Sequence, residues 1–188
     1  MALLTNIQLK KMEFKHLGEN VRISDKASIY RPEMISIGNN VRIDDFVVIS
    51  AGDGGVKIGN NIHIAVFCSI IGKGKVAIKD FANFSSRVSV YSSNDDYSGE
   101  SMTNPTIESK FTNVDHRSVA IGKHVIIGCG AVILPGATLE TGVVIGALSF
   151  VKAGKYNKFS MYAGIPAKYI KKRSDRLLKV EKEYLKVR

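Results

Sequence analysis

The sequence predicts an all-β protein, a parallel β-helix of hexapeptide repeats with a long inserted loop and a short C-terminal helix. Three observations support this prediction. Large aliphatic residues recur at every sixth position through most of the chain. A smaller apolar residue precedes nearly every one of them by two positions, as Val41 precedes Ile43. One long stretch without this rhythm interrupts the series.

The six-residue spacing excludes the usual templates. A helix repeats every 3.6 residues, so a spacing of six drifts off its face, and an ordinary strand alternates without a turn at each sixth position. A short strand followed by a sharp corner fits, because the aliphatic residue and the residue two before it then point inward together. Three such strands close a triangular coil, and stacked coils bury a continuous core. The large positions are Ile23, Ile29, Ile37, Ile43, Ile49, Ile58, Ile64, Ile70, Ile78, Phe84, Val90, Ile121, Ile127, Ile133, Leu139, Ile145 and Val151, enough for between five and six coils.

The breaks in the repeat indicate loops. Two extra residues enter near 31–35, three near 52–55 and two near 73–75, which predicts small bulges or corner loops. The large break lies between Val90 and Val119 and is rich in Ser, Asn and Asp. Long loops inside compact domains are usually functional or disordered, and here the repeat resumes cleanly afterwards. We therefore expect residues 91–118 to form an active-site loop.

The two ends differ from the repeat. We divide the chain into an N-terminal cap at 1–20, a β-helix domain at 21–170 and a C-terminal basic helix at 171–188. Residues 5–17 fit a short capping helix, and Ser174 is the expected N-cap of the C-terminal helix. Caps are expected because an open coil exposes unpaired strand edges.

The charge, the apolar stretches and the cysteine content of the chain indicate its class of partner and its compartment. The 188 residues carry a formal net charge of +10, with a dense basic run from Lys152 onward, so an anionic partner is expected. Aromatic residues do not alternate with the basic ones, which argues against nucleic acid. No apolar stretch reaches the roughly 18 residues of a membrane span. Two cysteines make no disulfide framework, and the N-terminus does not resemble a signal peptide, so we expect a cytoplasmic protein.

Residues 91–172 resemble the hexapeptide-repeat sugar acetyltransferases, such as galactoside and maltose acetyltransferases. The likeness is greater to a branch that acts on bacterial surface polysaccharides or their nucleotide-linked precursors. The segments that carry it are SSNDDYSGESMTNPT (92–106), IGKHVIIGCGAVILPGATLETGVVIGALSFV (121–151) and YAGIPAKYIKKR (162–173). The resemblance implies a left-handed β-helix, acetyl-CoA as cosubstrate, no metal, and a homotrimer with acetyl-CoA between subunits.

The resemblance also implies a set of cofactor-binding residues. Glycines would let the backbone approach the pantetheine arm closely, and lysines would meet the phosphates of CoA. The candidate cofactor-binding residues are Gly128, Ala131, Gly146, Ala147, Ser149, Ala163, Gly164, Lys168 and Lys171.

One departure bears on the catalytic residues. Relatives that acylate sugar hydroxyls use a loop His as general base, and the matching position here is Asp95. Asp95 or Asp96 is one candidate base, and a carboxylate suits this role only if its pKa is raised. His63, predicted to point outward from its strand, is a second candidate. A third explanation is that the acceptor is an amine. A neutral amine is already nucleophilic, so a strong base is less necessary, and Asp95 and Asp96 would hold its ammonium form and help to remove the proton.

The predicted function is transfer of acetyl from acetyl-CoA to a sugar, with a preference for the amino group of a nucleotide-linked amino-dideoxy sugar. Asn83, Asn94 and Tyr97 are the candidate sugar-binding residues. O-acetylation of a surface-polysaccharide sugar is the close alternative. A non-catalytic β-helix scaffold is the alternative from another class.

Overall fold

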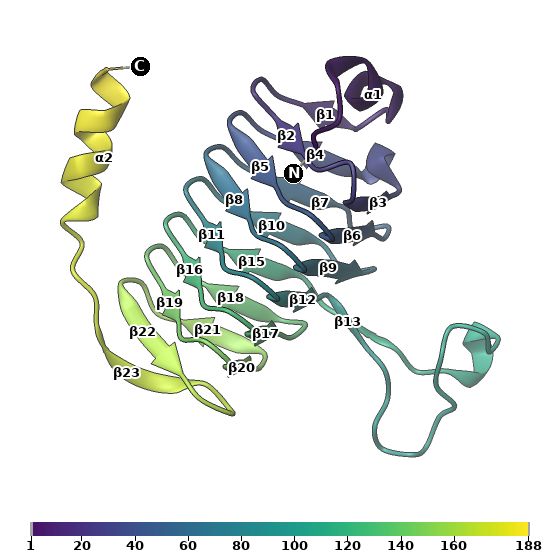
Figure 1. Cartoon of the computed structure of the whole chain (residues 1–188). Helices are drawn as coiled ribbons and strands as arrows, with labels where there is room; N and C mark the ends of the chain where they lie inside the picture. The colour runs from purple at the N-terminus through teal and green to yellow at the C-terminus, as the bar shows by residue number, and fades with distance from the viewer. Residues whose placement is uncertain (1, 188) are drawn as a thin grey trace.

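The computed structural model describes residues 2–187, which form a parallel β-helix (Figure 1). Short strands stack coil upon coil along one axis, and strands three places apart in the chain pair in parallel. The predicted fold, an all-β left-handed parallel β-helix, is confirmed.

Each coil contributes one strand to each of three sheets. The first sheet contains β1 (His16–Leu17), β4 (Ile35–Ile37), β7 (Val56–Ile58), β10 (Val76–Ile78), β15 (Val119–Ile121), β18 (Ala137–Leu139) and β21 (Gly154–Tyr156). The second contains β2 (Arg22–Ile23), β5 (Val41–Ile43), β8 (Ile62–Ile64), β11 (Asn83–Phe84), β16 (Ile126–Ile127), β19 (Val144–Ile145), β22 (Ser160–Ala163) and the antiparallel β23 (Lys168–Lys172). The third contains β3 (Ser28–Tyr30), β6 (Val48–Ala51), β9 (Ser69–Gly72), β12 (Ser89–Tyr91), β17 (Val132–Ile133) and β20 (Phe150–Val151).

The repeat residues form the core. All of the large aliphatic positions are buried except Ile29, which lies in the terminal coil and is half-buried. Full burial of one such side chain stabilises a protein by about 1.5–3 kcal/mol, so the stacked rows are the main stabilising feature of the fold. Cys68, at an inward position, is buried, while Cys129 at a corner is exposed.

The corner between the second and third sheets carries an exposed aromatic ridge. Phe46 and Phe67 both have left-handed backbone, with φ of 59° and 60°, and their rings stack with centroids 5.0 Å apart. Lys26 lies over the Phe46 ring and Arg87 over the Phe67 ring, each 5.6 Å from the centroid. We call Lys26, Phe46, Phe67 and Arg87 the aromatic ridge.

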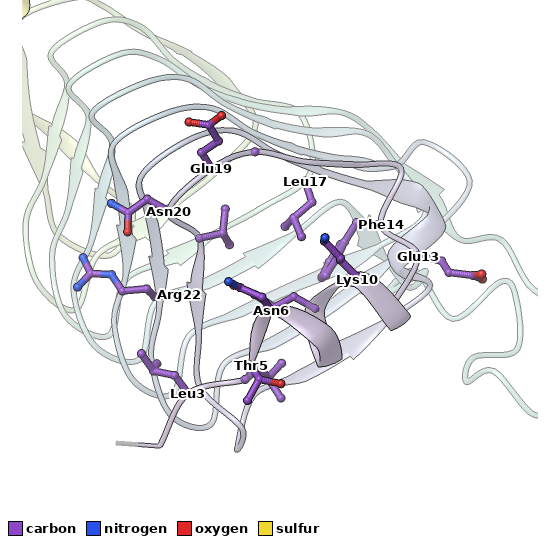
Figure 2. A pocket seen from close by; sticks show the side chains of 14 residues that line it. Leu3, Thr5, Asn6, Lys10, Glu13, Phe14, Leu17, Glu19, Asn20 and Arg22 are labelled. Atoms are coloured by element: carbon purple, nitrogen blue, oxygen red, sulfur yellow. The ribbon is translucent and has the colours of Figure 1, made fainter. Parts of the chain in front are cut away.

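A helix shorter than the expected 5–17 lies at the N-terminal end. Helix α1 (Asn6–Lys11) begins after Thr5, whose side chain forms a capping box with Gln8. The β-helix begins earlier than the expected residue 21, because β1 already pairs with β4. A cavity of about 830 Å³ lies between α1 and the first coil (Figure 2), and Leu9, Phe14 and Leu17 are among its lining residues.

The C-terminal helix α2 (Leu177–Lys186) begins later than expected, because residues 168–172 form β23 instead. Its N-cap is Arg176, so the predicted N-cap Ser174 is wrong; the Ser174 hydroxyl accepts a hydrogen bond from the Arg176 amide at 3.2 Å. The buried residue of α2 is Glu181, which forms ion pairs with Lys123 and His124. These contacts hold α2 beside the coils.

The predicted loop leaves the stack between β12 and β15 and projects away from it (Figure 1). Its two ends pair as antiparallel strands β13 (Ser93–Asn94) and β14 (Asp115–His116). A 3-10 turn, η2 (Ser109–Phe111), lies in its outer part, and another, η1 (Pro32–Met34), precedes β4. The paired base fixes the position of the residues that follow β13.

Candidate active site

A cavity of about 530 Å³ lies at the base of the long loop. Asp95 lines it, together with the cationic side chains of Arg31 and Lys73. His116 and Ser93 form one wall, with the His116 Nδ1 2.7 Å from the Ser93 hydroxyl. The same hydroxyl accepts a hydrogen bond from the Lys73 amide at 2.8 Å. The cavity therefore combines one carboxylate with two cations, a combination suited to a polar, anionic ligand.

The two candidate aspartates differ in their surroundings. Asp96 accepts a hydrogen bond from the Ser98 amide at 2.8 Å, which lowers the pKa of its carboxyl. A lowered pKa makes Asp96 a weaker base, whereas a general base needs a raised one. Asp95 is exposed and lines the cavity. The geometry therefore favours Asp95 over Asp96.

The two candidate sugar-binding residues of the loop lie close to Asp95 in the chain. The Asn94 side chain donates to the Asp95 carbonyl at 2.9 Å, so it supports the loop conformation. The Tyr97 side chain is 86% exposed and neither residue lines the cavity.

His63 and Asn83 lie side by side on the outer face of the second sheet, in register on β8 and β11. His63 points outward as predicted, and its Nε2 lies 2.8 Å from the Asp44 carboxylate. Asp44 is buried and also accepts a hydrogen bond from Arg42 Nε at 2.7 Å. Burial raises the pKa of Asp44, but the hydrogen bonds from His63 and Arg42 outweigh it, so the pKa is lowered and Asp44 stays ionised. Asp44 thus orients His63.

Within one chain the candidate catalytic residues form two separate groups. Asp95 lies where the chain passes from the third sheet to the first, while His63 and Asn83 lie on the second sheet. His63 does not line the cavity of about 530 Å³ at the loop base.

The candidate cofactor residues lie at the C-terminal coils. Gly128 and Gly146 follow β16 and β19 at the corner of the aromatic ridge. A Cβ on Gly128 would lie 2.5 Å from the Ala147 amide, and one on Gly146 would lie 2.8 Å from the Ala163 Cβ. Both glycines are therefore needed for coil stacking, whatever else contacts them.

The remaining cofactor candidates divide by exposure. Ala131 and Ser149 point into the core and are buried, and the Ser149 hydroxyl accepts a hydrogen bond from the Gly164 amide at 3.1 Å. The side chains of these two residues are thus unavailable to a ligand. The exposed candidates are Ala147, Gly164, Lys168 and Lys171, with Ala163 half-buried.

Sequence reasoning missed Arg22, Arg42 and Asp44, as well as the cations of the loop cavity. A signal was present, because one coil spans 20 or 21 residues. Counting back from His63 by one and two coils gives Arg42 and Arg22, which the pairing of β2, β5 and β8 places beside it.

Within residues 2–187 no three His, Cys, Asp or Glu side chains gather so that they could hold a metal ion. In the same residues no helix is long and apolar enough to cross a membrane.

Comparison with known proteins gives close relatives. The dTDP-4-amino-4,6-dideoxy-D-glucose acyltransferase of Escherichia coli is 60% identical over 181 residues, covering 96% of this chain and 94% of that enzyme. Two crystal structures of variants of AntD, an N-acyltransferase from Bacillus cereus, match over 100% of both chains with a TM-score of 0.95 and 42% identity, both with dTDP and coenzyme A bound. The lipopolysaccharide biosynthesis O-acetyl transferase WbbJ of Escherichia coli K12 is 32% identical over 74% of this chain and 61% of WbbJ. No family model matches the chain.

Proposed function

Because the chain belongs to the sugar acyltransferase family that includes the dTDP-4-amino-4,6-dideoxy-D-glucose acyltransferase, we propose that it acetylates the amino group of a dTDP-linked 4-amino-4,6-dideoxy sugar, with acetyl-CoA as donor. The observation that carries the proposal is the 60% identity over nearly the whole of both chains. AntD supports it, since one of its structures holds dTDP-4-amino-4,6-dideoxyglucose with coenzyme A.

Asp95 suits an amine acceptor. A neutral amine attacks the thioester carbonyl directly, the C–S bond breaks, and the CoA thiolate takes up a proton to leave as the free thiol. The ammonium form must first lose a proton, and the Asp95 carboxylate is the group at the loop base that would hold the ammonium and help to remove that proton. His63, oriented by Asp44, is the second candidate for this role.

The acyl group is the second part of the proposal. An AntD structure contains 3-hydroxybutyryl-CoA, so relatives of this fold are not restricted to acetyl. We propose acetyl for this chain, and initial rates with acetyl-, propionyl- and 3-hydroxybutyryl-CoA test it. A higher kcat/KM for either longer donor would contradict the acetyl assignment while leaving acyl transfer in place.

Matched acceptors test the amine. Thiol release from acetyl-CoA should occur with dTDP-4-amino-4,6-dideoxyglucose and be absent with dTDP-6-deoxyglucose, which has a hydroxyl in place of the amine. Equal rates with both sugars would favour the O-acetyl alternative, to which WbbJ is the related example. No thiol release with either sugar, together with no CoA binding, would favour a non-catalytic scaffold.

A homotrimer with the site between subunits is the assembly that we propose. In one chain Asp95 and the C-terminal coils that carry the candidate cofactor residues lie at different corners of the β-helix. In a trimer, the projecting loop of one subunit would reach the outer face of the neighbouring β-helix. The loop exposes Tyr97, Met102 and Phe111, and the aromatic ridge exposes apolar edges with cations at both ends. Light scattering should give three times the mass of one chain, and a monomer at assay concentration would contradict the shared site.

We further propose that the enzyme works in the cytoplasm, where its donor and a nucleotide-linked sugar are both found. The free Cys68 and Cys129 suit a reducing compartment. Fractionation of cells that express the native chain tests this, and recovery outside the cytoplasmic fraction would contradict it.

A further inference from the structure

The outer face of the second sheet carries a row of cations at its N-terminal end. We infer that Arg22 and Arg42 form a phosphate-binding strip that holds the diphosphate of the nucleotide-linked acceptor. This inference rests on the proposed function and adds the place where the nucleotide part of the substrate binds. The strip is defined as Arg22, Arg42 and the adjoining His63.

The strip brings like charges directly opposite each other. Arg22 pairs in register with Arg42, and Arg42 with His63, on strands that neighbour each other in the sheet. Adjacent strands are about 4.8 Å apart, and like charges on opposite positions destabilise a sheet. An anion between the two guanidinium groups would remove this repulsion.

The first and third sheets show no comparable row. At the same central positions the first sheet has Ser36, Lys57, Ala77 and Ala120, and the third has Val48, Ser69, Ser89 and Val132. Two cations in register are thus a property of the second sheet and not of the coil repeat.

A buried carboxylate orients the strip. Asp44 accepts hydrogen bonds from Arg42 Nε at 2.7 Å and from His63 Nε2 at 2.8 Å, with only 9% of its side chain exposed. Because Asp44 engages Arg42 through Nε, the two terminal nitrogens of the guanidinium remain available for a ligand. Nearly half of the Arg42 side chain is exposed. Arg22 is exposed and is one of the residues that line the cavity at the coil end (Figure 2).

The charges of the strip favour an anion. Asp44 offsets one of the two arginines, which leaves a surplus of at least one positive charge. The next carboxylate, Asp45, is already engaged by the Ser24 hydroxyl and by Lys26. Among residues 2–187, Arg22 has no salt bridge, so a ligand would meet a free guanidinium there. Guanidinium groups bind phosphate oxygens in pairs of parallel hydrogen bonds.

The position of the strip separates the two substrates. Farther along the same row the side chains become apolar, at Ile126, Val144 and Met161. This apolar half adjoins Gly128 and Gly146, the predicted cofactor coils. The cationic half is therefore left for the nucleotide-linked sugar. The two halves meet at β11, which belongs to the coil from which the long loop departs.

Calorimetric titration of the full-length protein tests the strip. The variants are Arg22→Gln and Arg42→Gln, and the probes are dTDP and CoA. Arg176→Gln, at the exposed N-cap of α2, is the matched control. Each strip variant should weaken dTDP binding by about 10-fold or more, the usual loss for a charge-assisted hydrogen-bonded contact, and leave CoA binding unchanged. Arg22→Gln breaks no salt bridge of the described chain, so it remains informative if Arg42→Gln folds poorly.

Three results would overturn the inference. These are dTDP binding within two-fold of the native protein in Arg22→Gln, a loss of CoA binding in place of dTDP binding, or no dTDP binding by the native protein. The acceptor assay distinguishes failure of this inference from failure of the proposed function. If both variants acetylate the amino sugar at the rate of the native protein and keep its dTDP affinity, the inference about the strip is wrong and the proposed function stands. If the variants lose dTDP binding but the native protein forms no amide, the proposed function is wrong and the strip stands.

Discussion

The regular coils and the long loop differ in how far their apolar side chains are buried. A coil residue such as Ile70 is held between the same positions of the coils before and after it, and it is completely buried. The loop has no such neighbours, and Tyr97, Met102 and Phe111 remain largely exposed. The repeat therefore provides stability, and we propose that the loop which interrupts it provides the chemistry. Substitutions in the two regions should therefore separate stability from rate.

The largest effect is expected in a central coil. Ile70→Ala should lower the free energy of unfolding by about 3 kcal/mol, because it leaves a cavity in a row of stacked side chains. Urea unfolding measures it, with the outward neighbour Ser69→Ala as control. A loss below 1 kcal/mol would mean that the coils relax around the cavity and are less tightly packed than their burial indicates.

In the loop, Asp95→Asn should lower kcat by about 100-fold, equivalent to about 2.7 kcal/mol in the activation free energy. The midpoint of urea unfolding should stay unchanged. Asp96→Asn is the matched control and should lose less, because Asp96 is engaged by Ser98. If Asp95→Asn keeps full rate, the same measurement on His63→Gln decides whether the second candidate is the base.

An intermediate effect is expected in α2, which a buried carboxylate fixes to the coils. Glu181→Gln should lower the free energy of unfolding by about 2 kcal/mol at pH 7, because it removes the charge that pairs with Lys123 and His124. Burial raises the pKa of Glu181, but the hydrogen bonds from His124 and Lys123 outweigh it, so the folded-state pKa is lowered.

A lowered pKa gives this contribution a definite pH dependence. It is fully present above the unfolded pKa of about 4.3 and is lost as the pH falls through the lower folded value. Thermal unfolding at a series of pH values should show the difference between native and Glu181→Gln proteins shrinking below about pH 4.3. A difference that grows on acidification would contradict the assigned role.

The smallest effect is expected at Tyr97, an exposed residue of the loop. Tyr97→Ala should change the free energy of unfolding by less than about 0.5 kcal/mol, because the ring is 86% exposed. If Tyr97 contacts the sugar in the assembled enzyme, the KM for the acceptor rises while kcat is kept. A measurable loss of stability would show that the loop is packed against a neighbouring subunit.

Much of the fold was predictable, because the spacing of the repeat residues is a local pattern. Val41 and Ile43, two positions apart, predict a short strand whose apolar side chains point inward, and this prediction needs no other part of the chain. Glu181 shows the limit, since a charged residue on an apparently solvated helix is buried by two partners 57 and 58 residues away in the chain. The Arg42–Asp44–His63 contact was similarly hidden, because it depends on a coil length of 21 residues at that point. Under the proposed trimer, Asp95 would meet the other candidate residues only across a subunit interface, which the sequence of one chain does not reveal.

The product of the reaction tests the central claim most directly. The native protein, acetyl-CoA and dTDP-4-amino-4,6-dideoxyglucose are incubated, and the nucleotide sugar is analysed by mass spectrometry and NMR. The expected product carries a single added acetyl group, joined through an amide at the sugar nitrogen. An ester at a sugar hydroxyl, or an unmodified sugar with acetyl-CoA intact, would contradict it.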